Sequence, residues 1–195
     1  NYKVAAKSKN EKSSYSDIYA EQLNDDNADS NSAMTNYPFG ASLAFESGLI
    51  GRTDEDFFYS ILELPATQRF EINKTGNLNE FSFGSGIAFN DKLMIGLSIG
   101  IPTISYDETF YVRETDETGV TEDLIYWDKE DKYRTEGTGI NAKIGVLFHP
   151  ISKLRIGASF TTPTRYSMKD QYATYFRADY ETYTLENFDN PAEGY

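Results

Sequence analysis

The sequence predicts an all-β fold: an antiparallel transmembrane β-barrel of which the chain holds only a part, built of meandering hairpins. Long extracellular loops with short helical insertions complete the predicted fold. A twelve-residue pattern occurs twice, at 92–103 and at 153–164, with Lys, Leu, Ile, Gly, Ser, Pro and Thr at the same offsets. Each copy follows a second alternating run and a turn, which is the pattern of a β-hairpin. In all four runs apolar residues alternate with glycine or polar residues, as in strands with one apolar face.

The first region in chain order, residues 1–78, is expected to be extracellular loop. Residues 1–36 are polar and rich in Asn, Ser and Asp, which is typical of a long loop that is partly disordered. After Pro38 the spacing of apolar residues is compatible with a short helix near 38–50, with a strand as the alternative. A second apolar group lies around Phe57, Phe58 and Leu62. It fits either the core of the loop region or a ligand-binding surface.

Residues 79–104 are predicted to form the first membrane hairpin and residues 137–168 the second. The apolar face of the first carries Phe81, Phe83, Ile87, Phe89, Leu93, Ile95, Leu97, Ile99 and Ile101. The apolar face of the second carries Ile140, Ala142, Ile144, Val146, Phe148, Leu154, Ile156, Ala158 and Phe160. The opposite faces are small or polar, and glycine recurs on them.

The turns of the two hairpins must keep each apolar set on one face, because a slip of one residue would exchange the faces. Loops of three residues (90–92) and five residues (149–153) satisfy this requirement. The predicted opposite pairs are Phe89–Leu93, Gly86–Gly96, Phe148–Leu154 and Gly145–Gly157.

The repeated glycines favour a barrel lumen over a water-facing sheet surface. Glycine weakens an exposed strand, but it is useful where the backbone curves or where an enclosed space must stay open. The alternative is a soluble sheet in which the glycines mark bulges and bends. The apolar phase from Leu93 to Ile101 favours a membrane, because nine tilted strand residues rise roughly 23 Å, close to the apolar band of an outer-membrane barrel. Pro102 and Pro163, which lack a ladder donor, are expected to end or bend the regular wall.

Acidic residues are concentrated outside the two hairpins, and the chain carries a formal net charge of −13. We therefore expect residues 105–136 and 169–195 to be extracellular loops, with the short turns facing the periplasm. Such charge argues against a nucleic-acid partner. The absence of cysteine fits an outer-membrane barrel but also many soluble proteins. Tyrosines near the outer strand ends suit either the membrane interface or long strands above it.

Chemistry-bearing residues are sparse, and no enzyme, cofactor or metal site is expected. The single histidine, His149, lies in a turn beside Pro150 without a nucleophile placed next to it. The acidic pairs do not have the ligand spacing of a calcium-binding loop. Four spanning strands cannot close a membrane barrel, whose smallest form has about eight, so the chain is expected to be an excerpt of a longer one.

The second hairpin resembles the FadL/TodX family of outer-membrane transporters for long-chain fatty acids and other hydrophobic compounds. The residues that carry the resemblance are Gly-x-Asn at 139–141, Gly145-Val146, Pro150, Leu-x-Ile-Gly at 154–157 and Pro163. The run from Asn79 to Pro102 is similar to an upstream hairpin of the family. The resemblance spans roughly residues 37–175.

The resemblance implies a barrel of about fourteen strands, an N-terminal plug, ligand-capturing loops and a wall bend that opens sideways, in the outer membrane of a Gram-negative bacterium. The family's plug signature does not occur in this chain. Gly100 and Pro102 are the candidate strand bend. We expect membrane lipid and a hydrophobic small molecule as partners.

The candidate ligand-binding residues fall into two groups. An apolar capture surface is expected from Phe39, Leu43, Phe57, Phe58 and Leu62. Lys143 and Arg155 are candidate lumen charges for a carboxylate, or they merely balance acids such as Glu80. The rival function is a non-transporting outer-membrane barrel that acts as a surface or secretion subunit, with its acidic loops binding a protein partner.

Overall fold

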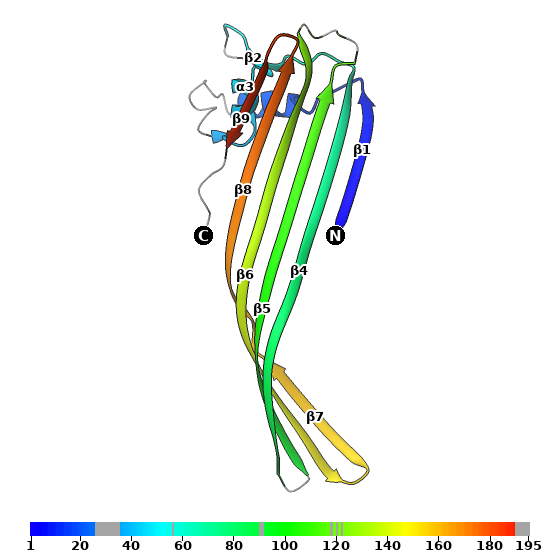
Figure 1. Ribbon diagram of the computed structural model, residues 1–195, viewed down its shortest axis with the longest axis vertical. Helices are drawn as coiled ribbons and strands as arrows, with labels where there is room; N and C mark the ends of the chain where they lie inside the picture. Colours follow the sequence, from blue (N-terminus) through cyan, green and yellow to red (C-terminus); the bar gives the residue numbers. More distant parts are fainter. Residues whose placement is uncertain are drawn as a thin grey trace. The chain divides into compact units, whose positions relative to one another are not determined.

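The computed structural model describes residues 1–25, 36–55, 57–89, 92–117, 119, 121 and 123–189. Most of them form an antiparallel sheet of seven strands, beside a two-stranded sheet and a few helical turns (Figure 1). The expected all-β class is therefore confirmed. The elements are β1 (Tyr2–Asn10), α1 (Asp17–Asp25), α3 (Ala41–Glu46), β2 (Ile50–Arg52), β3 (Phe58–Ser60), β4 (Ala66–Phe89), β5 (Leu93–Thr115), β6 (Leu124–Ile151), β7 (Leu154–Thr161), β8 (Arg165–Tyr180) and β9 (Thr184–Asp189).

The large sheet has the order β1-β4-β5-β6-β8-β9, and β7 pairs with β6. Strands β4 and β5 are therefore neighbours, and so are β6 and β7, which places both predicted hairpins in the sheet. The chain divides into two compact units. Unit 1 comprises residues 1–75, 107–133 and 171–193, and unit 2 comprises residues 76–106, 134–170 and 194–195.

Strands extend into three ranges that the sequence analysis expected to be loops. Strand β1 and helix α1 lie within 1–36, and β5 and β6 continue into 105–136. Strand β8 continues into 169–195, and β9 lies within that range. Strand β1 pairs with β4 without interruption, from Tyr2 opposite Lys74 to Asn10 opposite Ala66. The intrinsic strand preference of these polar segments is weak, and the pairing partner supplies what local propensity does not.

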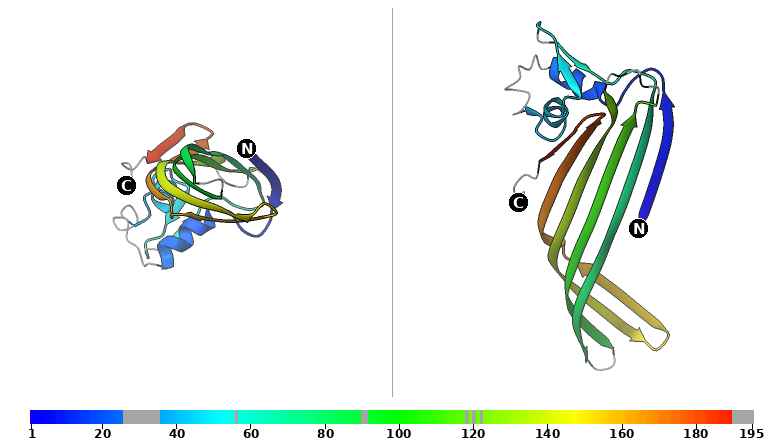
Figure 2. Two further views of the ribbon diagram at one scale, coloured as in Figure 1. Left: turned by 90° about the horizontal axis from the view of Figure 1, so that it is seen from below. Right: turned by 45° about the horizontal axis from the view of Figure 1, so that its top comes forward.

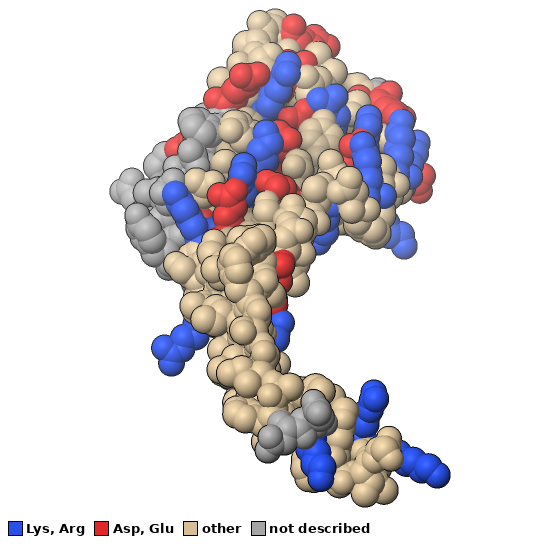
Figure 3. Space-filling model, turned by 60° about the horizontal axis from the view of Figure 1, so that its bottom comes forward, with Lys and Arg blue, Asp and Glu red and all other residues tan. Residues whose placement is uncertain are grey.

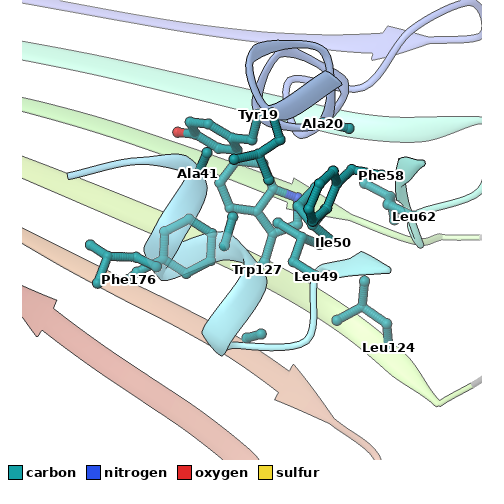
Figure 4. Close-up of a cluster of buried hydrophobic side chains, with 14 of the residues drawn as sticks. Tyr19, Ala20, Ala41, Leu49, Ile50, Phe58, Leu62, Leu124, Trp127 and Phe176 are labelled. Carbon is teal, nitrogen blue, oxygen red and sulfur yellow. The ribbon is translucent and has the colours of Figure 1, made fainter. Parts of the chain in front are cut away.

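Unit 1 has a packed core between its strands and a layer of short elements. Helices α1 and α3 and the β2–β3 hairpin lie side by side against the sheet strands (Figures 1 and 2). The buried apolar residues come from both layers, and many are drawn in Figure 4: Tyr19, Ala20, Leu23, Ala41, Leu43, Ala44, Leu49, Ile50, Phe58, Leu62, Ala66, Val112, Leu124, Trp127, Phe176, Ala178 and Tyr180. The ring of Trp127 stacks on Phe176, with centroids 5.3 Å apart.

The two helices of unit 1 begin and end on local signals. The carboxylate of Asp17, in the first turn of α1, accepts a hydrogen bond of 2.8 Å from the backbone N–H of Ser14, as in a capping box. Helix α3 lies within the range 38–50 expected to be helical. It is followed by Gly48, whose φ of +75° is the left-handed conformation that commonly ends a helix. The hydroxyl of Tyr180 donates to the Ser47 carbonyl, 2.8 Å away, and so joins this helix end to β8.

Unit 2 contains the turn ends of both hairpins. In the first hairpin, an added Cβ on Gly86 would lie 4.0 Å from the Cα of Gly96, which agrees with the predicted pairing of these glycines. In the second hairpin the predicted pairing is wrong by two residues. Phe148 pairs with Ile156, Gly157 with Leu147 and Gly145 with Ser159.

The cause of this error is a register shift between Phe148 and Ile151, so that the turn closes more tightly, with Ile151 opposite Leu154. The shifted segment contains Pro150, which cannot donate to a ladder. Because the error is an even number of residues, the face assignments hold. Ile144 still lies opposite Phe160, and both belong to the predicted apolar face.

Pro102 and Pro163, which were expected to end or bend the regular strands of the barrel wall, lie in different positions relative to the strand ends. Strand β5 continues through Pro102 to Thr115, so Pro102 does not end it. Pro163 lies between the end of β7 at Thr161 and the start of β8 at Arg165.

Within the described ranges, no helix has the length and apolar character needed to cross a membrane.

Candidate functional site

The apolar side chains of unit 2 are exposed rather than buried. Phe81 is 63% exposed, Leu97 61%, Ile144 43% and Ile156 55%. The same face also exposes Phe83, Ile87, Phe89, Ile99, Ile101, Ile140, Val146, Phe148, Leu154 and Phe160. No buried large hydrophobic side chain among the described residues belongs to unit 2. The face is thus a continuous apolar surface that is not packed against any other described part of unit 2.

The opposite face of unit 2 is hollowed by small residues. A hollow of about 580 Å³ is lined by four strands and mainly by apolar atoms. Its lining from this face comprises the small residues Gly86, Ala88, Gly96, Gly145, Gly157 and Ser159 and the larger Met94 and Leu147. Ile87, Ile95, Val146 and Ala158 of the apolar face also border it. An added Cβ on Gly145 would meet nothing nearer than 3.9 Å, so the glycines here leave open space rather than accommodate a close neighbour.

A polar bridge crosses β5 at Gly100. Glu80 on β4 accepts a hydrogen bond of 2.5 Å from the Lys143 Nζ and one of 3.2 Å from the Asn141 Nδ2, both on β6. Ser82 donates to the same carboxylate at 2.9 Å. A Cβ on Gly100 would lie 2.7 Å from Glu80 Oε1 and 2.6 Å from Asn141 Oδ1. Glycine at this position therefore lets side chains of non-adjacent strands meet.

In this bridge Lys143 balances Glu80, which is one of the two interpretations offered for it. Its ammonium group is paired with Glu80, so a ligand carboxylate would have to compete with a carboxylate of the chain. Arg155 lies on β7 and is exposed. The two candidate lumen cations therefore differ, one being paired and the other open to solvent.

Most of the expected capture surface is core. Leu43, Phe58 and Leu62 are at most 5% exposed and belong to the packed cluster of unit 1. The structure therefore places these three in the core of the loop region, one of the two alternatives left open by the sequence. Phe57 is 59% exposed, and Phe39 is half-buried with its ring 5.1 Å from that of Tyr172.

Sequence reasoning missed a buried carboxylate in unit 1. Glu114 on β5 is fully buried and accepts hydrogen bonds from the backbone N–H of Tyr15 at 2.7 Å, Gln68 Nε2 at 2.5 Å and Trp127 Nε1 at 3.0 Å. The Ser14 hydroxyl is a fourth donor, at 2.5 Å. A buried charge is tolerated when its hydrogen-bonding capacity is filled in this way. The sequence offered no signal of this role beyond the acidic side chain itself, and acidic side chains are more often solvent-exposed.

The sheet face of unit 1 that carries charges is covered by ion pairs and tyrosine rings. Arg113 pairs with Asp128, and its guanidinium lies 4.1 Å from the centroid of the Tyr126 ring. Lys132 lies 4.6 Å from the ring centroid of Tyr175. Burial, followed by the nearby Asp128 charge, raises the pKa of Tyr111 to about 12.

Neighbouring residues extend this charged face. Arg69 hydrogen-bonds to Glu71 and lowers the pKa of that carboxyl, with Lys3 3.8 Å away as a further cation. Two open hollows share Tyr111 and Glu130 in their linings, and most of their other lining residues are charged. This face is therefore suited to water.

Among the described residues, no group of three or more His, Asp and Glu side chains could hold a metal ion. No protein-family model matches the chain, and no curated protein matches it either.

Proposed function

We propose that the chain is part of an outer-membrane β-barrel that takes up hydrophobic small molecules, such as long-chain fatty acids, by passive capture and diffusion. The observation that carries the proposal is the two-faced hairpin sheet of unit 2. One face exposes a continuous set of large aliphatic and aromatic side chains, and the other is hollowed by glycine and lined mainly by apolar atoms. A bilayer would cover the first face, and the second would line the path of the ligand.

The proposal is supported by the free-energy cost of leaving this apolar face exposed to water. Soluble monomers rarely expose contiguous apolar patches larger than a few hundred Å². Each Å² of apolar surface transferred out of water stabilises by roughly 25 cal/mol, so lipid contact removes a large penalty. The apolar run of β5 from Leu93 to Ile101 has the length of a tilted membrane strand. In this proposal further strands outside the chain close the barrel.

We place the protein in the FadL/TodX family as part of the same proposal, on the strength of the repeated hairpin. The structure narrows the residues that can meet a ligand. Leu43, Phe58 and Leu62 are occupied in core packing, which leaves Phe57 and Phe39 as apolar candidates. Arg155 is the more accessible cation, because Lys143 is paired with Glu80.

Uptake of a labelled long-chain fatty acid tests the proposal in cells that carry or lack the full-length gene. Gly145→Leu should fill the hollow and reduce uptake severalfold at equal surface abundance. Ala142→Leu adds the same side chain to the exposed apolar face of the same strand and should leave uptake unchanged. Transport is excluded if deletion of the gene does not alter uptake, or if both variants behave alike.

A second candidate function is a surface interaction subunit, and the charged face of unit 1 favours it. The hollows around Tyr111 and Glu130 combine rings, cations and carboxylates, which are typical components of a polar protein interface. If deletion leaves uptake unchanged but removes a partner protein from the cell surface, this second function replaces the first.

A further inference from the structure

The charges of the two hairpins are opposite in sign to those of the whole chain. Residues 79–104 and 137–168 contain five Lys or Arg residues and two acids, Glu80 and Asp91, although the chain carries a net charge of −13. Three of these cations are Lys92, Lys153 and Arg155, at or beside the turns. Figure 3 shows Lys and Arg, with no Asp or Glu coloured beside them, at the end of unit 2 that carries the turns. Asp91 lies outside the described residues.

These three cations also differ in their pairing. At least ten of the 18 Lys and Arg side chains form ion pairs within the chain, and the Lys143–Glu80 contact is one of them. Lys92, Lys153 and Arg155 make no ion pair with any residue that the structure describes. Their charges are thus available to an external anion.

The two turns are joined to each other and lie beside apolar side chains. The backbone N–H of His149 donates to the Lys92 carbonyl, 2.7 Å away, and so joins the second hairpin to the turn of the first. Phe89 is 49% exposed, Ile151 62% and Leu154 46%, and all three lie next to the turns. Cations directly beyond an apolar surface occupy the position of lipid headgroups when that surface is in acyl chains.

We infer that this turn end of unit 2, where Lys92 and Lys153 lie in the turns, binds the phosphate-bearing headgroups of anionic phospholipids at the membrane surface. The inference rests on the proposed membrane insertion and adds which lipids the inserted hairpins prefer. The phosphate group supplies the negative charge with which no described residue of the chain provides these two lysines. A cation near an anionic bilayer surface gains about 1 kcal/mol, or roughly fivefold in affinity per residue.

The test compares binding of the full-length protein to vesicles of phosphatidylcholine alone and of phosphatidylcholine with one quarter phosphatidylglycerol, measured by flotation. We expect tighter binding to the anionic vesicles at low salt and loss of that difference at high salt. The double variant Lys92→Gln/Lys153→Gln should lose roughly 25-fold of the anionic preference. The charge-matched control Lys9→Gln/Lys12→Gln, which changes exposed residues of unit 1, should keep it.

The outcomes separate the inference from the proposed function. Equal binding to both vesicle types, or an equal loss in the control, overturns the headgroup inference while membrane insertion stands. Failure to bind or insert into either vesicle overturns the membrane assignment, and the headgroup inference with it.

Discussion

Units 1 and 2 are built from the same long strands but use their side chains in opposite ways. In unit 1 the large apolar residues are buried under helices and a small hairpin, and the sheet face with charged residues carries ion pairs. In unit 2 the large apolar residues are the exposed ones, and the small residues line a hollow. The difference teaches that alternation alone marks a strand, whereas the chemistry of its exposed face indicates the solvent.

Removing the buried carboxylate of unit 1 should have the largest effect. Glu114→Ala leaves Trp127 Nε1, Gln68 and the Tyr15 N–H without their acceptor, so we expect a loss of about 3–5 kcal/mol in the free energy of unfolding. Trp127, the only tryptophan, reports the transition by fluorescence. The control Glu117→Ala breaks an exposed pair with Lys7 and should cost less than about 1 kcal/mol. Equal losses would show that Glu114 is not a structural centre.

A charge on the exposed apolar face of unit 2 comes next in size. Leu97→Lys should destabilise the protein folded in vesicles by about 2–4 kcal/mol, because in the proposed membrane barrel that face meets lipid. Ser98→Lys places the same group on the opposite face of β5 and should cost little. Denaturant titrations in vesicles measure both. Equal stability of the Leu97 and Ser98 variants would contradict lipid contact at the exposed apolar face, and the two units would then not differ in their solvent.

Gly100 sharpens the comparison within unit 2. Gly100→Ala brings a Cβ within 2.7 Å of Glu80 Oε1, so the bridge to Lys143 must shift, at a cost of about 1 kcal/mol for a partly exposed ion pair. Gly145→Ala meets nothing nearer than 3.9 Å and should not destabilise. The same vesicle titrations compare the two. A larger loss from the Gly145 change would mean that the hollow is closed by packing.

A further effect on unit 1 is expected at alkaline pH. Burial raises the pKa of Tyr180 to about 12 from its ordinary value near 10, so the folded state favours the neutral phenol. The stability from this group is fully present below pH 10 and is lost as the pH rises toward 12. The ionised phenol also cannot donate to the Ser47 carbonyl. Trp127 fluorescence during titration should show the loss, and Tyr180→Phe should reduce it; an unchanged profile would contradict the assignment.

The hairpins of unit 2 could be predicted from sequence because their two faces differ at most positions. The alternation around Phe81, Leu97, Ile144 and Ile156 identified four strands and the faces of all four. The tight turn at Ile151 was not predictable from alternation, since a shift of two residues leaves the faces unchanged. Pro102 did not mark the end of β5, because a proline lacks one backbone hydrogen-bond donor but does not prevent the strand from continuing.

Unit 1 was far less predictable, and the reason is physical. Strand β1 alternates weakly and is defined by its pairing with β4, which lies over fifty residues away. The role of Glu114 depends on donors from Ser14, Tyr15, Gln68 and Trp127, which only the fold brings together. For the candidate site, the sequence offered ligand binding and charge balance with Glu80 as the two roles of Lys143, and the structure shows the pair with Glu80. It could not separate the core residues Leu43 and Phe58 from surface ones, because both kinds are apolar.

The Glu80–Lys143 contact has a geometric consequence. It joins β4 to β6 across an intervening strand, so it responds to the stagger between strands that share no backbone hydrogen bonds. In a closed barrel the number of strands and the cumulative stagger, or shear, together fix the tilt and the radius. In the barrel that we propose, slippage of β4 past β6 would separate the Glu80 carboxylate from the Lys143 ammonium group, so this one pair would report the stagger on which the barrel diameter depends.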